Sequence, residues 1–121
     1  MNKKVLIIDD NKGDRMCLSM ALKDLGCPET LEAETGEQGV ESCRTNQPDI
    51  VVLDTILPKM NGFETCRAIK ALPGKKPTVV LLTGVPDAVS AGFAREAGAD
   101  KYTIKTVEYE EFKKCVRPLL A

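Results

Sequence analysis

Charged and hydroxyl residues end four predicted strands in this sequence. Asp9 and Asp10 come directly after one apolar run, and Asp54 comes directly after a second. Thr83 comes after a third apolar run, and Lys105 follows the short predicted strand 101–104. Carboxylates that are crowded together repel one another unless a cation joins them, and their hard oxygen atoms suit Mg²⁺. Because an ammonium and a hydroxyl group can hold phosphoryl oxygen atoms, these residues predict phosphoryl chemistry that depends on Mg²⁺.

Asp54 has the setting expected of a nucleophile. It ends the apolar run 50–53, whose β-branched residues predict a buried strand. Pro58 and the Asn61-Gly62 pair then predict a loop before a helical pattern resumes. A carboxylate at the carboxyl end of a buried strand lies where α/β proteins place their chemistry. Since a carboxylate can form a covalent aspartyl phosphate, we predict that Asp54 accepts a phosphoryl group.

The elements that must position these residues alternate along the chain. Predicted strands begin near Val5, Thr30, Ile50, Thr78 and Lys101. Helical patterns follow each of them, near 14–25, near 36–45, from 63 onward, near 87–97 and from about 107. Strands that alternate with helices in this way predict an α/β fold in which helices cover both faces of a parallel sheet.

Three details of the helices are specific enough to test. Asp14 follows a turn and is predicted to cap the amino end of the first helix. Val89, Phe93 and Ala97 are expected on one side of the fourth helix. Pro118 is expected to disturb the final turn of the last helix.

Composition limits the possible functions. The 121 residues are enough for one domain, and no apolar run approaches the ~18 residues of a membrane-spanning helix. Lys and Arg number 17 and Asp and Glu number 18, which argues against electrostatic capture of nucleic acid or of an anionic membrane. We therefore expect a cytoplasmic protein that neither inserts into a membrane nor binds nucleic acid directly.

The cysteines and the absence of histidine exclude other chemistry. The five cysteines contain no C-x-x-C pair and are expected to be small apolar residues on buried helix faces. Without histidine, a zinc site or a Cys/His nucleophile is not expected. A histidine that donates a phosphoryl group would have to belong to a partner protein.

In four segments the chain resembles the receiver domain of two-component response regulators, the CheY-like family. The matching segments are IIDD at 7–10, VVLDTILPKMNGFE at 51–64, LLTG at 81–84 and GADKYTIK at 98–105. The resemblance covers essentially all 121 residues and implies a single receiver domain over 1–121. It implies the flavodoxin-like receiver fold, a doubly wound parallel sheet of five strands in the order 2-1-3-4-5 with five helices.

The resemblance implies a role for each residue of the site. Asp54 is the expected site of phosphorylation. Asp10, Asp54 and the backbone carbonyl of Ile56 are the expected ligands of Mg²⁺, and Asp9 is expected to act largely through water. Lys105 is expected to bind the phosphoryl group.

The resemblance also implies a switch and a set of partners. Thr83 is expected to move toward the phosphoryl group while Tyr102 changes rotamer, which alters the face formed by the fourth helix, the fifth strand and the fifth helix. A histidine kinase or a histidine phosphotransfer protein is the expected donor. We find no DNA-binding or enzymatic output domain in the sequence. We therefore expect the output to pass to a partner protein or to a C-terminal effector domain outside this sequence. We expect no enzyme beyond a receiver that assists its own phosphorylation and dephosphorylation.

Two positions depart from the family pattern. Thr106 stands where the family usually has a proline in a cis peptide bond, and a cis bond before a residue other than proline costs ~2.5–4 kcal/mol, so we predict a trans bond. Ile56 and Val85, two residues after Asp54 and Thr83, cannot place an attacking water molecule through polar side chains. We therefore predict slow self-dephosphorylation.

Three alternatives compete with this interpretation. A flavodoxin-like nucleotide binder would lead from its first strand into a loop that accepts phosphate, whereas this strand leads into two aspartates. A haloacid-dehalogenase-type phosphatase requires Asp-x-Asp, whereas this chain has Asp9-Asp10-Asn11. The third alternative is a degenerate receiver that binds proteins without phosphate, and the intact set of site residues argues against it.

Overall fold

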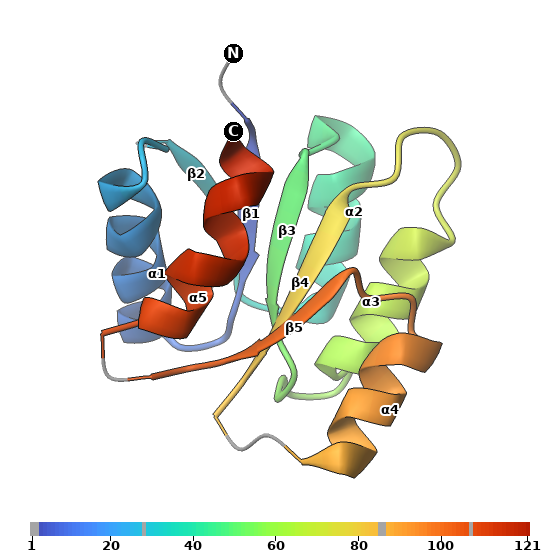
Figure 1. Ribbon diagram of the computed structural model, residues 1–121. Helices are drawn as coiled ribbons and strands as arrows, with labels where there is room; N and C mark the ends of the chain where they lie inside the picture. The colour runs from blue at the N-terminus through green and yellow to red at the C-terminus, as the bar shows by residue number, and fades with distance from the viewer. Residues whose placement is uncertain (1–2, 28, 85–86, 107) are drawn as a thin grey trace.

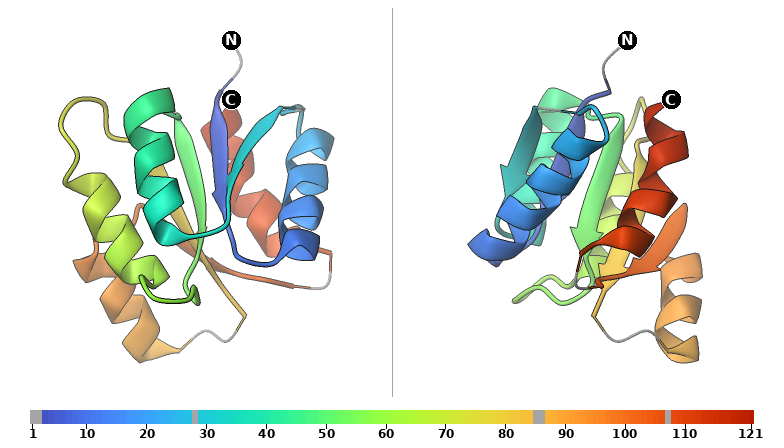
Figure 2. Two further views of the ribbon diagram at one scale, coloured as in Figure 1. Left: turned by 180° about the vertical axis from the view of Figure 1, so that it is seen from behind. Right: turned by 60° about the vertical axis from the view of Figure 1, so that its left-hand side comes forward.

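The computed structural model describes residues 3–27, 29–84, 87–106 and 108–121. Within these residues one sheet of five parallel strands lies between two layers of helices (Figures 1 and 2). The strands are β1 (Val5–Ile8), β2 (Thr30–Ala33), β3 (Ile50–Asp54), β4 (Thr78–Thr83) and β5 (Lys101–Ile104). Their order is β2-β1-β3-β4-β5 and each neighbouring pair is parallel, which confirms the predicted topology.

The helices are divided between the two faces of the sheet. They are α1 (Lys12–Asp24), α2 (Gly36–Asn46), α3 (Gly62–Lys70), α4 (Ala88–Glu96) and α5 (Glu110–Val116), and α5 continues into the 3₁₀ helix η1 (Arg117–Leu120). α1 and α5 cover one face, and α2, α3 and α4 cover the other (Figure 2). The final turn around Pro118 is therefore 3₁₀ rather than α-helical, as its missing N–H group predicts.

Alternate strand residues supply the core on each side of the sheet. In β1, Val5 and Ile7 face the α1 and α5 layer, while Leu6 and Ile8 face the opposite layer. All four are fully buried. The inner strands β1 and β3 are covered on both faces and are buried along their whole length, so their first polar residues are the aspartates at their carboxyl ends. This arrangement brings the polar strand ends together at one edge of the sheet.

The amino end of α1 differs from the prediction. Asn11 is the N-cap residue, and its side chain accepts a hydrogen bond of 2.9 Å from the backbone N–H of Asp14. The prediction that Asp14 caps the helix was wrong, because the shorter turn places Asn11 at the cap and Asp14 in the first helical turn. The carboxylate of Asp14 is thereby free to act elsewhere.

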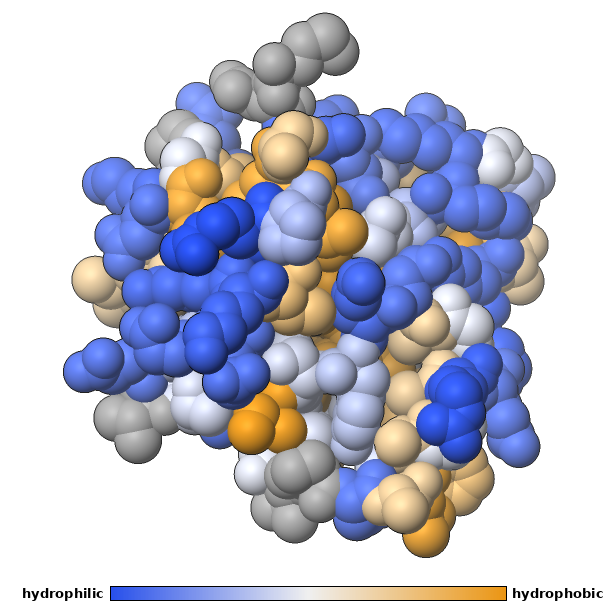
Figure 3. All heavy atoms as spheres, viewed as in Figure 1, coloured by the Kyte–Doolittle hydropathy of each residue, from blue (hydrophilic) through white to orange (hydrophobic). Residues whose placement is uncertain are grey.

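The three apolar residues predicted on one side of α4 differ in how far they are buried. Ala97 is buried after the end of the helix, but Val89 and Phe93 are 66% and 48% exposed. Ala94, rather than Phe93, packs into the core from this helix. Figure 3 shows the apolar surface over the lower part of α4. Phe93 is partly covered because its ring packs against Phe63 of α3, with a centroid distance of 5.7 Å.

The cysteines are free thiols, and most of them lie in the interior. Cys27, Cys43 and Cys66 are buried and Cys115 is half-buried, whereas Cys17 is exposed on α1. The prediction of cysteines on buried helix faces is therefore correct for Cys43 and Cys66 and wrong for Cys17, while Cys27 is buried in the loop after α1. Burial raises the pKa of the Cys43 and Cys66 thiols to about 11, which keeps them protonated and unreactive at neutral pH.

Candidate functional site

The carboxyl ends of four strands meet at the lower edge of the sheet in Figure 1. β1 is paired with β3, β3 with β4, and β4 with β5, so the residues after these strands become neighbours although they are far apart in sequence. Asp54 lies beside Leu82 in the register of β3 and β4, and Thr83 lies beside Ile104 in that of β4 and β5. The sheet thus brings the predicted residues to one edge.

The carboxylates of Asp9, Asp10 and Asp54 form a compact group. One oxygen atom from each lies within 4.8 Å of the others. Asp9 is buried, Asp54 is nearly buried and Asp10 is exposed, so the group opens toward solvent on one side. The backbone N–H of Asn11 donates a hydrogen bond of 2.9 Å to Asp9 Oδ1. The backbone N–H of Ile56 donates one of 3.1 Å to Asp54 Oδ1. These hydrogen bonds hold one oxygen atom of each buried carboxylate in place.

Lys105 supplies the positive charge of the site. Its Nζ lies 3.1 Å from Asp54 Oδ2 and 3.2 Å from both Asp9 Oδ2 and Asp14 Oδ2. Burial alone would lower the pKa of Lys105, but the charges of Asp54 and Asp9 outweigh it and raise this pKa above its ordinary value. Lys105 is therefore a fixed ammonium ion at neutral pH.

The pKa of the Asp9 carboxyl is raised above its ordinary value. Burial is the main cause, and the charge of Asp54 adds to it, while the N–H of Asn11 and the charge of Lys105 act in the opposite direction. A buried carboxylate beside a second carboxylate is costly to ionise. The site therefore favours any further cation that reaches it.

Thr83 is buried at the end of β4 and also helps to place Lys105. The backbone N–H of Lys105 donates a hydrogen bond of 2.8 Å to the carbonyl oxygen of Thr83. This bond extends the pairing of β4 with β5 by one residue beyond Ile104. The Lys105 side chain consequently starts beside β4, from where it reaches Asp54.

The loop after β3 returns close to Asp54, where only glycine fits. A Cβ atom on Gly62 would lie 2.2 Å from the carbonyl oxygen of Asp54 and 2.6 Å from Cα of Thr55. The N–H of Gly62 donates a hydrogen bond of 3.0 Å to the carbonyl oxygen of Thr55. Asn61 and Glu64 form a capping box that starts α3 at this point. The Asn61-Gly62 pair, predicted as a turn, therefore packs against the backbone of the acceptor strand.

Two residues of α1 belong to the site although sequence reasoning missed them. Asp14 contributes a further carboxylate to Lys105. Arg15 is buried, and its Nη1 donates 2.8 Å to the carbonyl oxygen of Asp9 while its Nε donates 2.8 Å to Oε1 of Glu32. For Arg15, the sequence offers one signal of this role, which is its position about one helical turn after the aspartate pair at the end of a strand.

The remaining predicted residues lie at or near this edge. Ile56 is 75% exposed beside Asp54, and Val85 lies outside the described residues. The 105–106 peptide bond is trans, as predicted, since the described part of the chain contains no cis bond. Tyr102 is half-buried, and its hydroxyl, like that of Thr106, is buried without a hydrogen-bond partner among the described residues.

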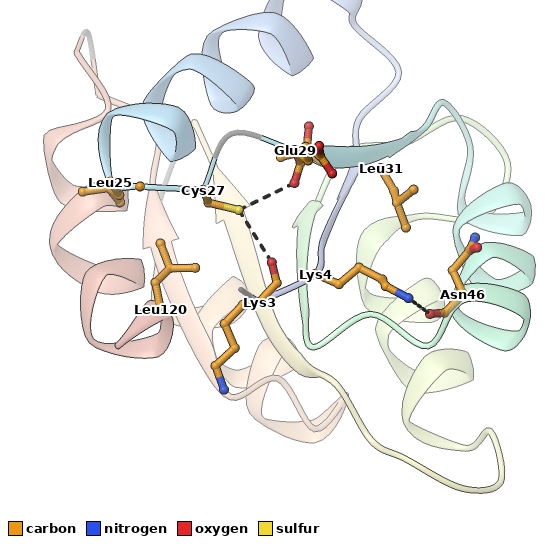
Figure 4. Close-up of a pocket in the computed structure, with 10 residues that line it drawn as sticks. Lys3, Lys4, Leu25, Cys27, Glu29, Leu31, Asn46 and Leu120 are labelled. Atoms are coloured by element: carbon orange, nitrogen blue, oxygen red, sulfur yellow. Dashed lines mark hydrogen bonds between the residues drawn. The ribbon is translucent and has the colours of Figure 1, made fainter. Parts of the chain in front are cut away.

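A hollow lies at the opposite edge of the sheet from the acidic residues. It is bordered by Lys3, Lys4, Cys27, Asn46 and Leu120, among others, and Figure 4 shows these side chains. The Sγ atom of Cys27 donates to backbone carbonyls, and Lys4 Nζ donates to the carbonyl of Asn46. None of the predicted site residues borders this hollow.

No helix in the described ranges has the length and apolar character needed to cross a lipid bilayer.

Comparison with known proteins identifies the family. The family described as "Response regulator receiver domain" matches residues 5–117. The DNA-binding response regulator MtrA of Mycolicibacterium smegmatis is 33% identical over 120 residues, which are 99% of this chain and 51% of MtrA. This chain therefore spans about half the length of the curated relatives that it matches.

Solved structures agree with this family. The BeF3-activated receiver domain of DrrB from Thermotoga maritima has a TM-score of 0.84 and 33% identity, covering 99% of this chain and 98% of the other. The chemotaxis protein CheY4 of Vibrio cholerae has a TM-score of 0.89 and 25% identity, covering 99% and 100%. The chain thus belongs to the receiver domain family of the response regulators of two-component signalling systems.

Proposed function

We propose that residues 1–121 form one receiver domain in which Asp54 accepts a phosphoryl group. The observation that carries this proposal is the position of Lys105 Nζ, 3.1 Å from the Asp54 carboxylate at the carboxyl edge of the sheet. Asp54 is nearly buried, and one of its oxygen atoms is already held by the N–H of Ile56. A carboxylate in this position is oriented as a nucleophile. The negative charge of the phosphoryl group that it would carry lies next to the ammonium ion of Lys105.

The proposed donor is the phosphohistidine of a histidine kinase or of a histidine phosphotransfer protein. A carboxylate oxygen of Asp54 attacks the phosphorus atom and forms a P–O bond. The P–N bond of the donor breaks at the same time, and the imidazole nitrogen keeps the electron pair and takes up a proton from solvent. Lys105 and the hydroxyl group of Thr83 then hold the phosphoryl oxygen atoms.

Mg²⁺ is the proposed cofactor because the acidic residues fit it. Asp9, Asp10 and Asp54 present oxygen atoms within 4.8 Å of one another, and hard oxygen ligands are those that Mg²⁺ prefers. Asp10, Asp54 and the backbone carbonyl of Ile56 are the proposed ligands, with Asp9 acting largely through water. When bound, Mg²⁺ neutralises charge on the carboxylates and on the phosphoryl group.

The proposed response is a switch at Thr83 and Tyr102. Thr83 moves toward the phosphoryl group, and Tyr102 changes rotamer and alters the surface of α4, β5 and α5. The unpartnered hydroxyl of Tyr102 supports this step, because a buried hydroxyl without a hydrogen bond destabilises the conformation that contains it. A rotamer that gives this hydroxyl a partner is therefore favoured over the present one.

The output is proposed to pass to a protein partner or to an effector domain on the same polypeptide. The matched relative MtrA is a DNA-binding response regulator, about half of which this chain spans. The near balance of 17 basic and 18 acidic residues gives the receiver itself no basis for direct nucleic-acid binding. The receiver assists its own phosphorylation but is not proposed to act on any other substrate, and we place it in the cytoplasm.

The test is Mg²⁺-dependent phosphorylation by acetyl phosphate, followed by intact-mass measurement of the protein. The wild type and Asp24→Ala, which removes an exposed aspartate of α1, should each gain one phosphoryl group, whereas Asp54→Ala should gain none. Labelling of Asp54→Ala to the same extent would contradict the proposal. If neither acetyl phosphate nor phosphorylated histidine proteins label the wild type, the chain is instead a phosphate-independent binding module.

A further inference from the structure

We propose that Asp14 is a positioning residue that controls phosphorylation through Lys105. In the unphosphorylated chain its carboxylate holds the ammonium group that a phosphoryl group must later use. This inference rests on the proposed function of Asp54 and adds a residue that neither the strand-end pattern nor the acidic group of Asp9, Asp10 and Asp54 includes.

The ammonium group of Lys105 has as many carboxylate partners as it has N–H donors. A lysine ammonium has three N–H donors and no acceptor. Among the described residues, carboxylates of Asp9, Asp14 and Asp54 lie at 3.1–3.2 Å from Nζ, one for each donor. A phosphoryl oxygen on Asp54 can therefore pair with Lys105 only if one of these hydrogen bonds is given up.

The three carboxylates that hold Lys105 differ in their exposure to water. The side chain of Asp9 is 1% exposed and that of Asp54 is 10% exposed, whereas that of Asp14 is 40% exposed. Water can solvate Asp14 after it separates from Lys105, but it reaches Asp9 poorly. Because exposed ion pairs cost least to break, Asp14 is the partner that gives way.

Asp14 also lies at the amino end of α1. Asn11 caps the helix and places Asp14 in its first turn, where a carboxylate is also favoured by the helix dipole. A purely structural role in α1 would make the removal of this charge destabilising and would leave phosphorylation unchanged or impaired. The proposed role predicts the opposite effect on phosphorylation, so the two roles are distinguishable.

Asp14→Asn keeps the shape of the side chain and removes its charge. We expect this variant to be phosphorylated about two- to fivefold faster by acetyl phosphate, the range that corresponds to the loss of one partly exposed ion pair. Glu37→Gln is the matched control, because it removes an exposed first-turn acid from α2, away from Lys105. Its phosphorylation rate should equal that of the wild type.

The pathway through Lys105 is tested in a Lys105→Met background. If Asp14 acts through Lys105, Asp14→Asn should have no effect on the slower rate of Lys105→Met. An equal acceleration in both backgrounds would mean that Asp14 only repels the anionic donor, and it would overturn the inference. The inference would also be overturned if Asp14→Asn, with Lys105 intact, were phosphorylated no faster than the wild type.

Urea unfolding of the wild type, Asp14→Asn, Lys105→Met and the double variant provides a measurement that does not depend on phosphorylation. We expect a favourable coupling between Asp14 and Lys105, so that the double variant loses less stability than the two single variants together. If the wild type is phosphorylated but Asp14 and Lys105 show no coupling, the role of Asp14 is refuted and the proposed function of Asp54 stands. Coupling without labelling of the wild type would instead refute the proposed function of Asp54, and with it the role of Asp14 in phosphorylation.

Discussion

The buried guanidinium group of Arg15 donates a hydrogen bond of 2.8 Å to the backbone carbonyl oxygen of Asp9. The same side chain is paired with Glu32 of β2 at 2.8 Å and with Glu34 at 3.5 Å. Arg15 therefore joins α1, β1 and β2 directly beneath the acidic residues. Its charge is offset by the two glutamates, so its contact with the acidic group is the hydrogen bond to the Asp9 backbone.

Arg15→Met should destabilise the protein because it removes the donor to a buried carbonyl while keeping most of the apolar stem. We expect a loss of about 1.5–3 kcal/mol in the free energy of unfolding, measured with urea. Arg44→Ala is the control, because its pair with Glu41 is exposed, and we expect a change of only about 0–1 kcal/mol. Equal losses for the two variants would show that Arg15 has no special role.

Gly62→Ala should damage the acceptor loop, since its Cβ atom would approach the carbonyl oxygen of Asp54 to 2.2 Å. The loop must shift to relieve this contact, and we expect a loss of about 1–3 kcal/mol together with slower phosphorylation. Gly92→Ala in α4 is the matched control. Its nearest contact would be Arg95 Nη2 at 3.9 Å, so we expect a gain of about 0.5–1 kcal/mol from helix propensity. A Gly62→Ala protein as stable as wild type would contradict the close packing.

Tyr102→Phe should leave the unphosphorylated protein at least as stable as the wild type. The hydroxyl group that it removes is buried without a partner among the described residues, so its loss relieves a desolvation cost of up to about 1 kcal/mol. Thermal and urea unfolding measure this effect. A loss of more than about 1 kcal/mol would mean that the hydroxyl is satisfied in the folded protein.

Asp49 should make stability depend on acid pH. The N–H of Lys4 is the main cause that lowers the pKa of this carboxyl, and the ammonium of Lys75 adds to it. A carboxyl with a lowered pKa contributes stability above its unfolded pKa of about 3.9, and that stability is lost as the pH falls through the folded pKa. Asp49→Asn should therefore be less stable than wild type at pH 7, and the difference should shrink below about pH 4. A difference that is constant with pH would exclude this linkage.

Ile56→Asn combined with Val85→Glu should shorten the lifetime of the phosphorylated protein. Ile56 is 75% exposed beside Asp54, where an amide could hold an attacking water molecule. We expect about tenfold faster dephosphorylation, below the ~10²–10⁴-fold contribution of an optimised general base. Val89→Glu, which changes another exposed apolar residue, should leave the lifetime unchanged. An unchanged lifetime in the double variant would refute the explanation for slow turnover.

The residues at the strand ends show which features of the site can be predicted from local sequence. Asp9, Asp54 and Lys105 could be expected at one edge because apolar strands that alternate with helices pair in parallel, and parallel strands end on the same side. The trans bond before Thr106 followed from covalent geometry alone. The order of the strands, by contrast, was implied only by resemblance to a family, since local patterns do not state which strands are neighbours.

The roles of Asp14, Arg15 and Phe93 were decided by the tertiary structure. Capping by Asn11 sets where α1 begins, and this fixes the rotation of the helix, so that Asp14 meets Lys105 and Arg15 is buried under Asp9. On α4 the sheet has room for Ala94 and Ala97, which leaves Phe93 outside against Phe63. The sequence by itself determined the elements and the chemistry at their ends, because these depend on local patterns. Which side of each helix meets the sheet depended on packing between residues far apart in the chain.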